Sequence, residues 1–142
     1  MSNAVDSANL ILKLYELRRE ETLRKAREFM LPFDPASFEE VQAGYMGPQG
    51  TYIRMVTSYW EMACSFVTSG AIDAKTFDDA NGEHILVFSK IQPWLPQLRE
   101  MFGSEGFMKN LEKVCSEAPG GLERVTATRE RIRKMLAMRR AA

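Results

Sequence analysis

The stretch SYWEMACSFVTSG, from Ser58 to Gly70, decides the fold that we predict for this chain. It concentrates tyrosine, tryptophan, cysteine and phenylalanine around one acidic residue, Glu61. On a helical wheel of 51–69, apolar side chains cover more than half of the circumference, which is typical of a helix contacted by several neighbours. We therefore predict a central buried helix over 51–69, which a left-handed cap at Gly70 ends.

The remaining surface of helix 51–69 is a narrow polar line. Its members follow at spacings of four, three and four residues, so successive side chains are neighbours on the helix; they are Arg54, Ser58, Glu61 and Ser65. One interpretation places Glu61 in solvent, or links it to Arg54 through a third group. A second makes the line part of a polar ligand-binding groove with Tyr59 and Trp60, and a third assigns it to an interface.

Segments on both sides of this helix also have helical periodicity. The first runs from about Ser7 to Met30 and is predicted as one helix, which Pro32 ends. No segment shows the period of two that is typical of strands. The predicted fold is therefore all-α: a single-domain bundle of about six helices over 7–140, with 1–6 as a disordered or expression-derived N-terminus.

The composition indicates one globular domain. The chain has 142 residues, of which 45% are hydrophobic and 27% charged, which is close to the average of soluble proteins. The net charge of zero hides an asymmetry, because 122–142 carries seven basic and two acidic residues whereas 31–121 is acidic. A basic end on an acidic body predicts pairing of these charges, or an acidic protein partner.

Few residues suggest metal or catalytic chemistry. His84 is the single histidine, and Cys64 and Cys115 lie far from it and from each other in sequence, so we predict no metal site and no cofactor. The cysteines are interpreted as buried free thiols of a cytoplasmic protein, with a disulfide left open. No nucleophile elbow, phosphate-binding loop, signal peptide or membrane span is evident, so no membrane insertion is expected.

The arginine-rich C-terminal helix, about Leu122 to Met138, carries two further hypotheses. Its arginines lack interleaved aromatic residues, which disfavours nucleic acid as a partner. Weak nucleic-acid association is kept as an alternative, through Arg124, Arg131, Arg133 and Arg140. Arg129 falls on the apolar stripe of this helix, so we expect it to meet a carboxylate of another helix or to lie at a chain–chain interface.

Three segments together resemble a bacterial all-α family of unknown function. They are LYELRREETLRKAREFM, YWEMACSFVTSGAID and FSKIQPWLPQLRE. The matching positions are Leu14, Tyr15, Leu17, Arg18, Trp60, Glu61, Gly70, Ile72, Asp73, Pro93, Trp94 and Arg99. The resemblance implies a helical fold and no reaction. Some relatives follow a membrane anchor, which this sequence does not show.

The leading functional prediction is a non-enzymatic protein-interaction module that forms a homodimer. Its expected interface residues are Leu10, Leu14, Leu17 and Arg129. The alternative is a small-ligand binder or an enzyme with a pocket near Trp60, Glu61 and His84. Its full candidate lining is Arg54, Tyr59, Trp60, Glu61, His84 and Trp94.

Overall fold

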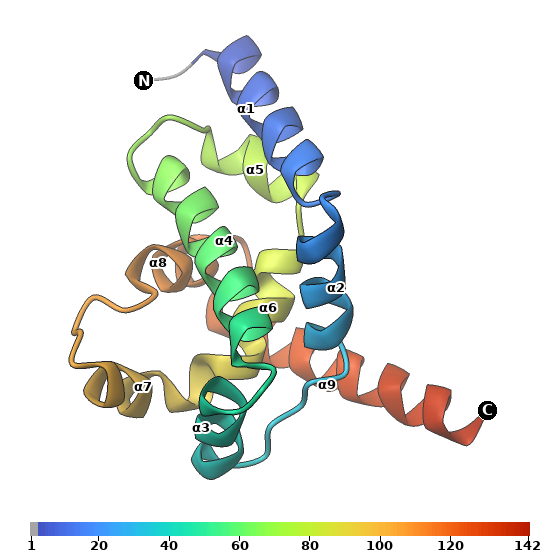
Figure 1. Cartoon of the computed structure of the whole chain (residues 1–142). Coiled ribbons are helices and arrows are strands. Elements are labelled where there is room, and N and C mark those ends of the chain that lie inside the picture. The colour runs from blue at the N-terminus through green and yellow to red at the C-terminus, as the bar shows by residue number, and fades with distance from the viewer. Residues whose placement is uncertain (1–2) are drawn as a thin grey trace.

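The computed structural model describes residues 3–142, and over this range every regular element is helical (Figure 1). These residues form nine α-helices and one 3-10 turn, so the all-α class is confirmed and the predicted number of about six helices is wrong. The helices are α1 (Ala4–Leu17), α2 (Glu21–Met30), α3 (Phe38–Met46), α4 (Gly50–Thr68), α5 (Ala74–Ala80), α6 (Glu83–Ile91), α7 (Leu95–Phe102), α8 (Lys109–Glu117) and α9 (Gly121–Ala141). The 3-10 turn Gln92–Trp94 precedes α7.

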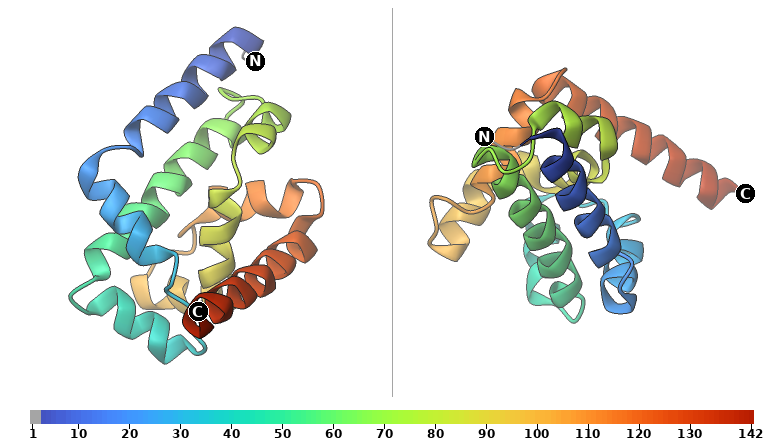
Figure 2. Two further views of the ribbon diagram at one scale, coloured as in Figure 1. Left: turned by 90° about the vertical axis from the view of Figure 1, so that its right-hand side faces the viewer. Right: turned by 90° about the horizontal axis from the view of Figure 1, so that it is seen from above.

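Helix α4 lies at the centre of the single domain, as Figures 1 and 2 show. It packs most extensively against α2 and α8 and also contacts α3, α5 and α6. The side chains of Ile53, Trp60 and Ala63 are almost completely buried. At its start, a Cβ on Gly50 would overlap the carbonyl oxygen of Tyr45, so only glycine allows the tight turn from α3.

The predicted first helix over 7–30 is two helices, and its break is caused by a capping residue. Glu20 is the N-cap of α2, and its carboxylate accepts hydrogen bonds from the backbone N–H groups of Thr22 at 3.0 Å and Leu23 at 2.9 Å. Serine, threonine, asparagine and aspartate are the usual N-caps, so Glu20 gave no boundary signal. The break lets α2 bury Leu23, Ala26 and Met30 in the core.

The N-terminal boundary also differs from the prediction. Helix α1 begins at Ala4 rather than near Ser7, because the side chain of Asn3 accepts a hydrogen bond from the N–H of Asp6 at 2.8 Å. This is an ordinary N-cap. The predicted N-terminal segment 1–6 therefore overlaps the first turn of α1, and its residues 1 and 2 lie outside the described residues.

Further breaks also raise the number of helices, and local sequence signals mark each of these boundaries. Asp73 caps α5, since its Oδ2 accepts from the N–H of Thr76 at 2.9 Å. Pro93 and Pro96 divide the segment after α6 into a 3-10 turn and α7, because proline cannot donate to the preceding turn. Gly103 ends α7 in the left-handed conformation.

The C-terminal helix α9 covers the side of the domain formed by α6 and α8. It buries one stripe, made of Val125, Thr128, Ile132 and Leu136. Its last turns project from the body of the domain, as Figures 1 and 2 show. The stripe therefore closes the core, whereas the projecting end carries exposed arginines.

Candidate functional site

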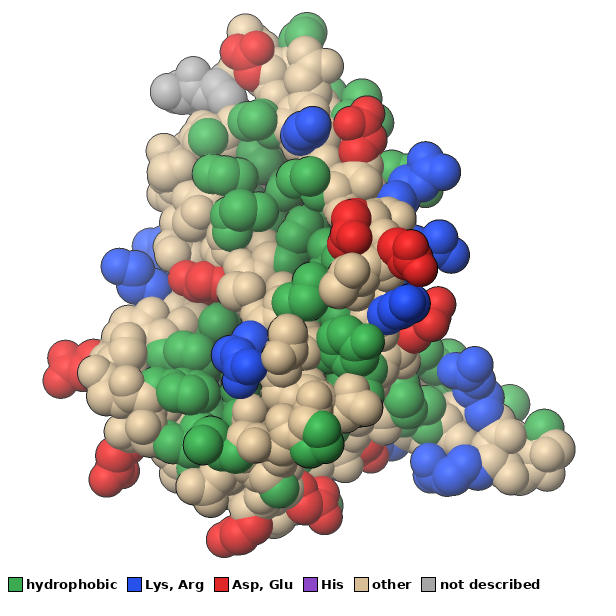
Figure 3. Space-filling view, viewed as in Figure 1, with side chains coloured by type: hydrophobic (Ala, Val, Ile, Leu, Met, Phe, Trp, Pro, Cys, Tyr) green, Lys and Arg blue, Asp and Glu red, His purple; other side chains and the backbone are tan. Residues whose placement is uncertain are grey.

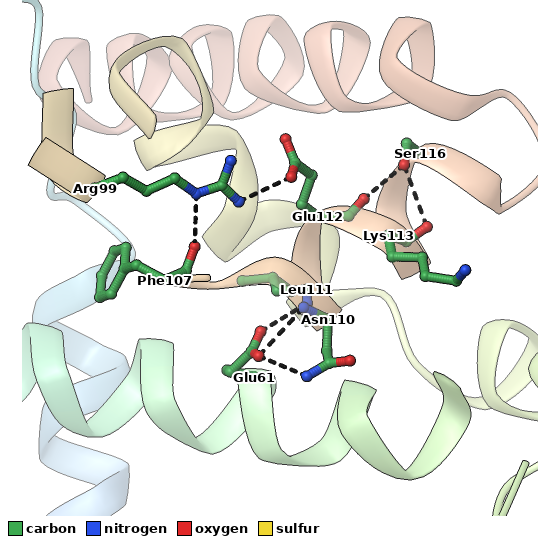
Figure 4. Close-up of polar contacts among 8 residues, drawn as sticks. All are labelled: Glu61, Arg99, Phe107, Asn110, Leu111, Glu112, Lys113 and Ser116. Carbon is green, nitrogen blue, oxygen red and sulfur yellow. Dashed lines mark hydrogen bonds and ion pairs between the residues drawn. The ribbon is translucent and has the colours of Figure 1, made fainter. Parts of the chain in front are cut away.

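Glu61 ties α4 to the start of α8 (Figure 4). Its Oε1 accepts a hydrogen bond from the N–H of Leu111 at 2.8 Å, and its Oε2 accepts from the backbone N–H of Asn110 at 3.2 Å and from its side-chain amide at 2.8 Å. The N-cap residue of α8, Met108, has no side-chain oxygen to accept from these N–H groups. Glu61 therefore supplies the missing cap and a favourable negative charge at a helix N-terminus, a role that none of the three interpretations anticipated.

Arg54 binds a different part of the chain from Glu61, although both residues lie on the same polar line. Its guanidinium donates to the carbonyl oxygen of Tyr45 and to Oγ1 of Thr51, both at 3.2 Å. Tyr45 belongs to the last turn of α3, whose carbonyl groups lack partners within the helix. The predicted groove between Arg54 and Glu61 is thus replaced by two separate helix-end contacts.

Tyr59 and Trp60 join α4 to three other elements. The Tyr59 hydroxyl donates to the carbonyl oxygen of Leu14 in α1, and the Trp60 indole N–H donates to Oε2 of Glu83 at 3.0 Å. Arg27 of α2 binds both oxygens of Glu83, at 2.9 and 3.0 Å, and donates to the carbonyl oxygen of Arg18 at 3.3 Å. This group closes the break between α1 and α2.

His84 contacts Trp60, but it is sealed inside the core. Its ring centroid lies 5.6 Å from that of Trp60 and 4.8 Å from that of Phe77. Neither ring nitrogen has a hydrogen-bond partner among the described residues, and burial lowers the pKa of His84 to about 4. The ring is therefore a neutral core aromatic at neutral pH.

Trp94 does not join the other predicted pocket residues. It is half-buried in the turn after the C-terminal end of α6, whereas His84 lies at the start of that helix. A helix of this length separates its two ends by about 13 Å. Of the six predicted lining residues, the structure thus places Tyr59 and His84 each against Trp60 and directs Arg54, Glu61 and Trp94 elsewhere.

A cavity of about 250 Å³ lies beside the Arg27–Glu83 pair. Its charged lining comes from Arg24, Arg27, Glu28 and Glu83, and its apolar lining from Met30, Leu31, Val56, Leu86 and Val87. Sequence reasoning missed all of these residues as a site, because they come from α2 with its C-cap Leu31, from α4 and from α6, and converge only in the folded chain. The Glu83 carboxylate connects the cavity wall to the Trp60 indole.

The predicted interface residues of α1 differ in their burial. Leu14 is only 5% exposed and packs inside the domain, so its assignment to an interface is wrong. Leu10 and Leu17 are exposed at the flank of the helix. The inward face of α1 is held by Leu14 and by Ser7, whose hydroxyl oxygen accepts from the N–H of Asp73 at 3.0 Å.

The outward face of α1 carries an apolar stripe that the sequence analysis did not single out. Val5 is 67% exposed, Leu12 59% and Tyr15 50%, and Ala8 lies exposed between them. Large exposed apolar side chains in a continuous set mark interaction surfaces in soluble proteins. The sequence analysis missed this stripe because it followed Leu10, Leu14 and Leu17, which lie on another side of the same helix.

Arg129 is hydrogen-bonded inside the domain, as expected for a half-buried arginine. Its Nε donates to the carbonyl oxygen of Ser89 at 2.7 Å and its Nη2 to Oε1 of Gln92 at 2.9 Å. Burial lowers the pKa of Arg129. No carboxylate is among these contacts, so the predicted ion pair is wrong: Arg129 instead binds the C-terminal end of α6.

The basic charges of α9 partly pair with the acidic body, as the charge asymmetry predicted. Arg124 forms an ion pair with Asp78 at 2.8 Å, and Arg133 forms one with Asp34 at 2.9 Å. Two of the four arginines proposed for nucleic-acid contact are thus used within the chain. Arg131 and Arg140 remain exposed.

Cys64 and Cys115 are free, buried thiols. Burial raises the pKa of Cys115 to about 12 and also raises that of Cys64, so both are protonated at neutral pH. Over residues 3–142, no cluster of three histidine, cysteine, aspartate or glutamate side chains could hold a metal ion. In the same range, no helix has both the length and the apolar character needed to cross a bilayer.

These features define an all-helical domain with a central helix whose neighbours are tied to it by side-chain contacts at helix ends. The chain belongs to the family DUF4760, a domain of unknown function, whose sequence model matches residues 3–117. The matched range includes α1 to α8 and ends before α9. No curated protein and no solved structure matches the chain.

Proposed function

We propose that this chain is a protein-interaction module that pairs with a second copy of itself through α1. The observation that carries the proposal is the exposed stripe of Val5, Ala8, Leu12 and Tyr15. Its spacings of three, four and three residues are those by which two helices pack along a common seam. The opposite face of α1 is already used to hold the helix on the domain.

The stripe is complementary to itself when two α1 helices run antiparallel. About a two-fold axis level with Leu10, Val5 lies opposite the partner's Tyr15, and Ala8 lies opposite the partner's Leu12. Each pair then combines a smaller with a larger side chain, which allows close packing of the two helices. Such a contact uses the same patch on both copies, as two-fold symmetric dimers require.

Electrostatics also favours this antiparallel arrangement. Glu16 flanks the seam at the level of the partner's Ala4, the first residue of α1. A carboxylate near a helix N-terminus is stabilising because the exposed N–H groups carry partial positive charge. Arg19 follows α1, and its guanidinium lies 5.9 Å from the centre of the Tyr15 ring, so the apolar seam ends with a charge.

The size of α1 limits the strength of the pairing. Fourteen residues form a helix of about 20 Å, so the seam lies at the small end of specific interfaces. Figure 3 shows a band of hydrophobic side chains beside α1 and over α4, where Met62 is exposed and Met55 and Phe66 are half-buried. We therefore expect a dimer with a dissociation constant on the order of micromolar.

Sedimentation equilibrium on the full chain and two matched variants tests the proposal. The native chain is expected to approach twice the monomer mass of 16.2 kDa at tens of micromolar. Leu12→Glu, which places a charge in the seam, is expected to remain monomeric. The control Leu122→Glu changes a leucine of similar exposure, 48%, on α9 and is expected to dimerise like the native chain. A native monomer, or equal loss of dimer in both variants, contradicts the proposal.

A further inference from the structure

Arg24 lies unpaired at the edge of the cavity between α2 and α6. Among residues 3–142 its side chain has no hydrogen bond or ion pair. The favourable partner by sequence is Glu20, four residues earlier. Both carboxylate oxygens of Glu20 instead accept hydrogen bonds from the first N–H groups of α2. Because Glu20 caps this helix, the guanidinium of Arg24 is left without its favourable partner.

Glu28, one turn after Arg24, is also unpaired within the described range. Arginine followed by glutamate four residues later is the weaker order for a helical pair, and no ion pair joins them. Glu28 also borders a second hollow with Arg139 and Arg140, and it pairs with neither. A free cation and a free anion thus lie one helical turn apart on one face of α2, where residues at this spacing have Cβ atoms about 6 Å apart.

The floor between and below these two charges is apolar. Met30, Val56 and Val87 are buried there, and Leu31 and Leu86 are half-buried. The remaining charged wall, Arg27 with Glu83, is already satisfied by its own ion pair. A volume of about 250 Å³ is about that of eight water molecules, which suits a small ligand.

We propose that this cavity binds a free α-amino acid with an apolar side chain. Its carboxylate would pair with Arg24, its ammonium group with Glu28, and its side chain would cover the apolar floor. Charge-assisted contacts at both ends of one small zwitterion match the two unpaired charges. The amino terminus of a peptide is a poorer match, because its nearest carboxylate is displaced along the chain.

Trp60 provides a readout of occupancy, since its indole N–H is bonded to the cavity-wall residue Glu83. Replacing Trp94, the other tryptophan, by phenylalanine leaves Trp60 as the only indole. In Trp94→Phe, titration with L-leucine, L-methionine or L-phenylalanine is expected to give a saturable change in indole emission. Isothermal titration calorimetry on the native chain checks that the signal reports binding.

Blocked analogues and point variants test each charge separately. Leucinamide lacks the carboxylate, and N-acetyl-leucine lacks the ammonium group. Each is therefore expected to bind at least about ten-fold more weakly than leucine. Arg24→Gln and Glu28→Gln are expected to reduce leucine affinity by a similar factor. The control Lys25→Gln lies on the same helix, where Lys25 pairs with Glu21 at 3.4 Å outside the cavity, and is expected to leave binding unchanged.

Three results would overturn this assignment. The first is no saturable signal with any of the three amino acids at tens of millimolar, where even a dissociation constant near 1 mM gives near-saturation. The second is equal binding of leucine by Arg24→Gln, Glu28→Gln and the native chain. The third is leucylglycine binding as tightly as leucine, which would identify a peptide amino terminus as the ligand. Circular dichroism spectra confirm that the variants are folded, both those at the exposed Arg24, Lys25 and Glu28 and the one at the half-buried Trp94.

Discussion

At the scale of single residues, the side chains that first suggested a binding site hold helices together. Glu61 caps α8, Arg54 binds the end of α3, and Tyr59 anchors α1. The sequence predicted the polar line that Arg54 and Glu61 share, because helical spacing is local. It did not predict their partners, because Asn110 and Leu111 follow Glu61 by about fifty residues. Local patterns cannot report such distant contacts.

Replacing Glu61 by glutamine is expected to destabilise the domain by about 1–3 kcal/mol. Glutamine keeps one acceptor oxygen, but it turns the other into a donor that faces the N–H groups of α8. Urea denaturation monitored by circular dichroism measures the change. The control Glu105→Gln alters an exposed glutamate in the loop before α8 and is expected to have little effect. Equal stability of the two variants would show that the cap is dispensable.

His84 makes the stability of the domain depend on pH. Its pKa is about 4 in the folded chain, against an ordinary value of 6.5. Between these values the unfolded chain binds more protons, so folding stability falls as the pH drops from 6.5 towards 4. The loss is on the order of 3 kcal/mol.

The variant His84→Phe keeps a ring at this position and removes the titration, so its stability is expected to fall less over the same pH range. Urea melts at pH 7 and pH 4.5 measure both chains, and carboxylates contribute equally to each. Identical pH dependence in the two chains would contradict the neutral, buried state of the imidazole.

At the scale of elements, the type of structure was predictable and several boundaries were not. The helical period of α4, the aspartate cap of α5 and the prolines before α7 are local signals, and the structure has a helix or a break at each. The break between α1 and α2 depends on Glu20, a residue that is common inside helices. The outward face of α1 was missed because both faces of that helix are apolar, and only packing shows which one is buried.

Helix α9 lies outside the residues that match the family, yet it supplies part of the core. Val125, Ile132 and Leu136 are buried where α9 covers α6 and α8. The side chain of Arg129 also binds the end of α6. We infer that the domain of this chain needs α9 to exclude water from α6 and α8.

A chain truncated after Gly120 is therefore expected to lose cooperative thermal unfolding and to bind a hydrophobic dye, since the apolar faces of α6 and α8 become exposed. Circular dichroism melting and dye fluorescence measure both effects. A second truncation that removes only Arg139 to Ala142, which are exposed, is the control and should melt like the full chain. If the chain 1–120 unfolds cooperatively and does not bind the dye, the rest of the domain folds without α9 and the inference is wrong.

At the scale of the whole molecule, the domain has one core, and the two proposals each rest on a surface feature that the domain itself leaves without a partner. The composition predicted a single globular domain, and the described residues form one. The core satisfies most of its own polar groups, while α1 leaves an apolar stripe exposed and α2 leaves two charges unpaired. Sequence reasoning predicted pairing through α1 but placed Leu14 in the interface, because a helical wheel does not show which face the domain has already covered.

Cross-linking in a defined register tests the pairing of α1 most directly. The native thiols are buried, so cysteines introduced at position 8 or 12 react selectively. Ala8→Cys and Leu12→Cys chains are expected to form a disulfide-linked dimer when mixed, and none when each is oxidised alone, because Ala8 lies opposite the partner's Leu12. No cross-link in the mixture, or equal cross-linking of each variant alone, would contradict antiparallel pairing through α1.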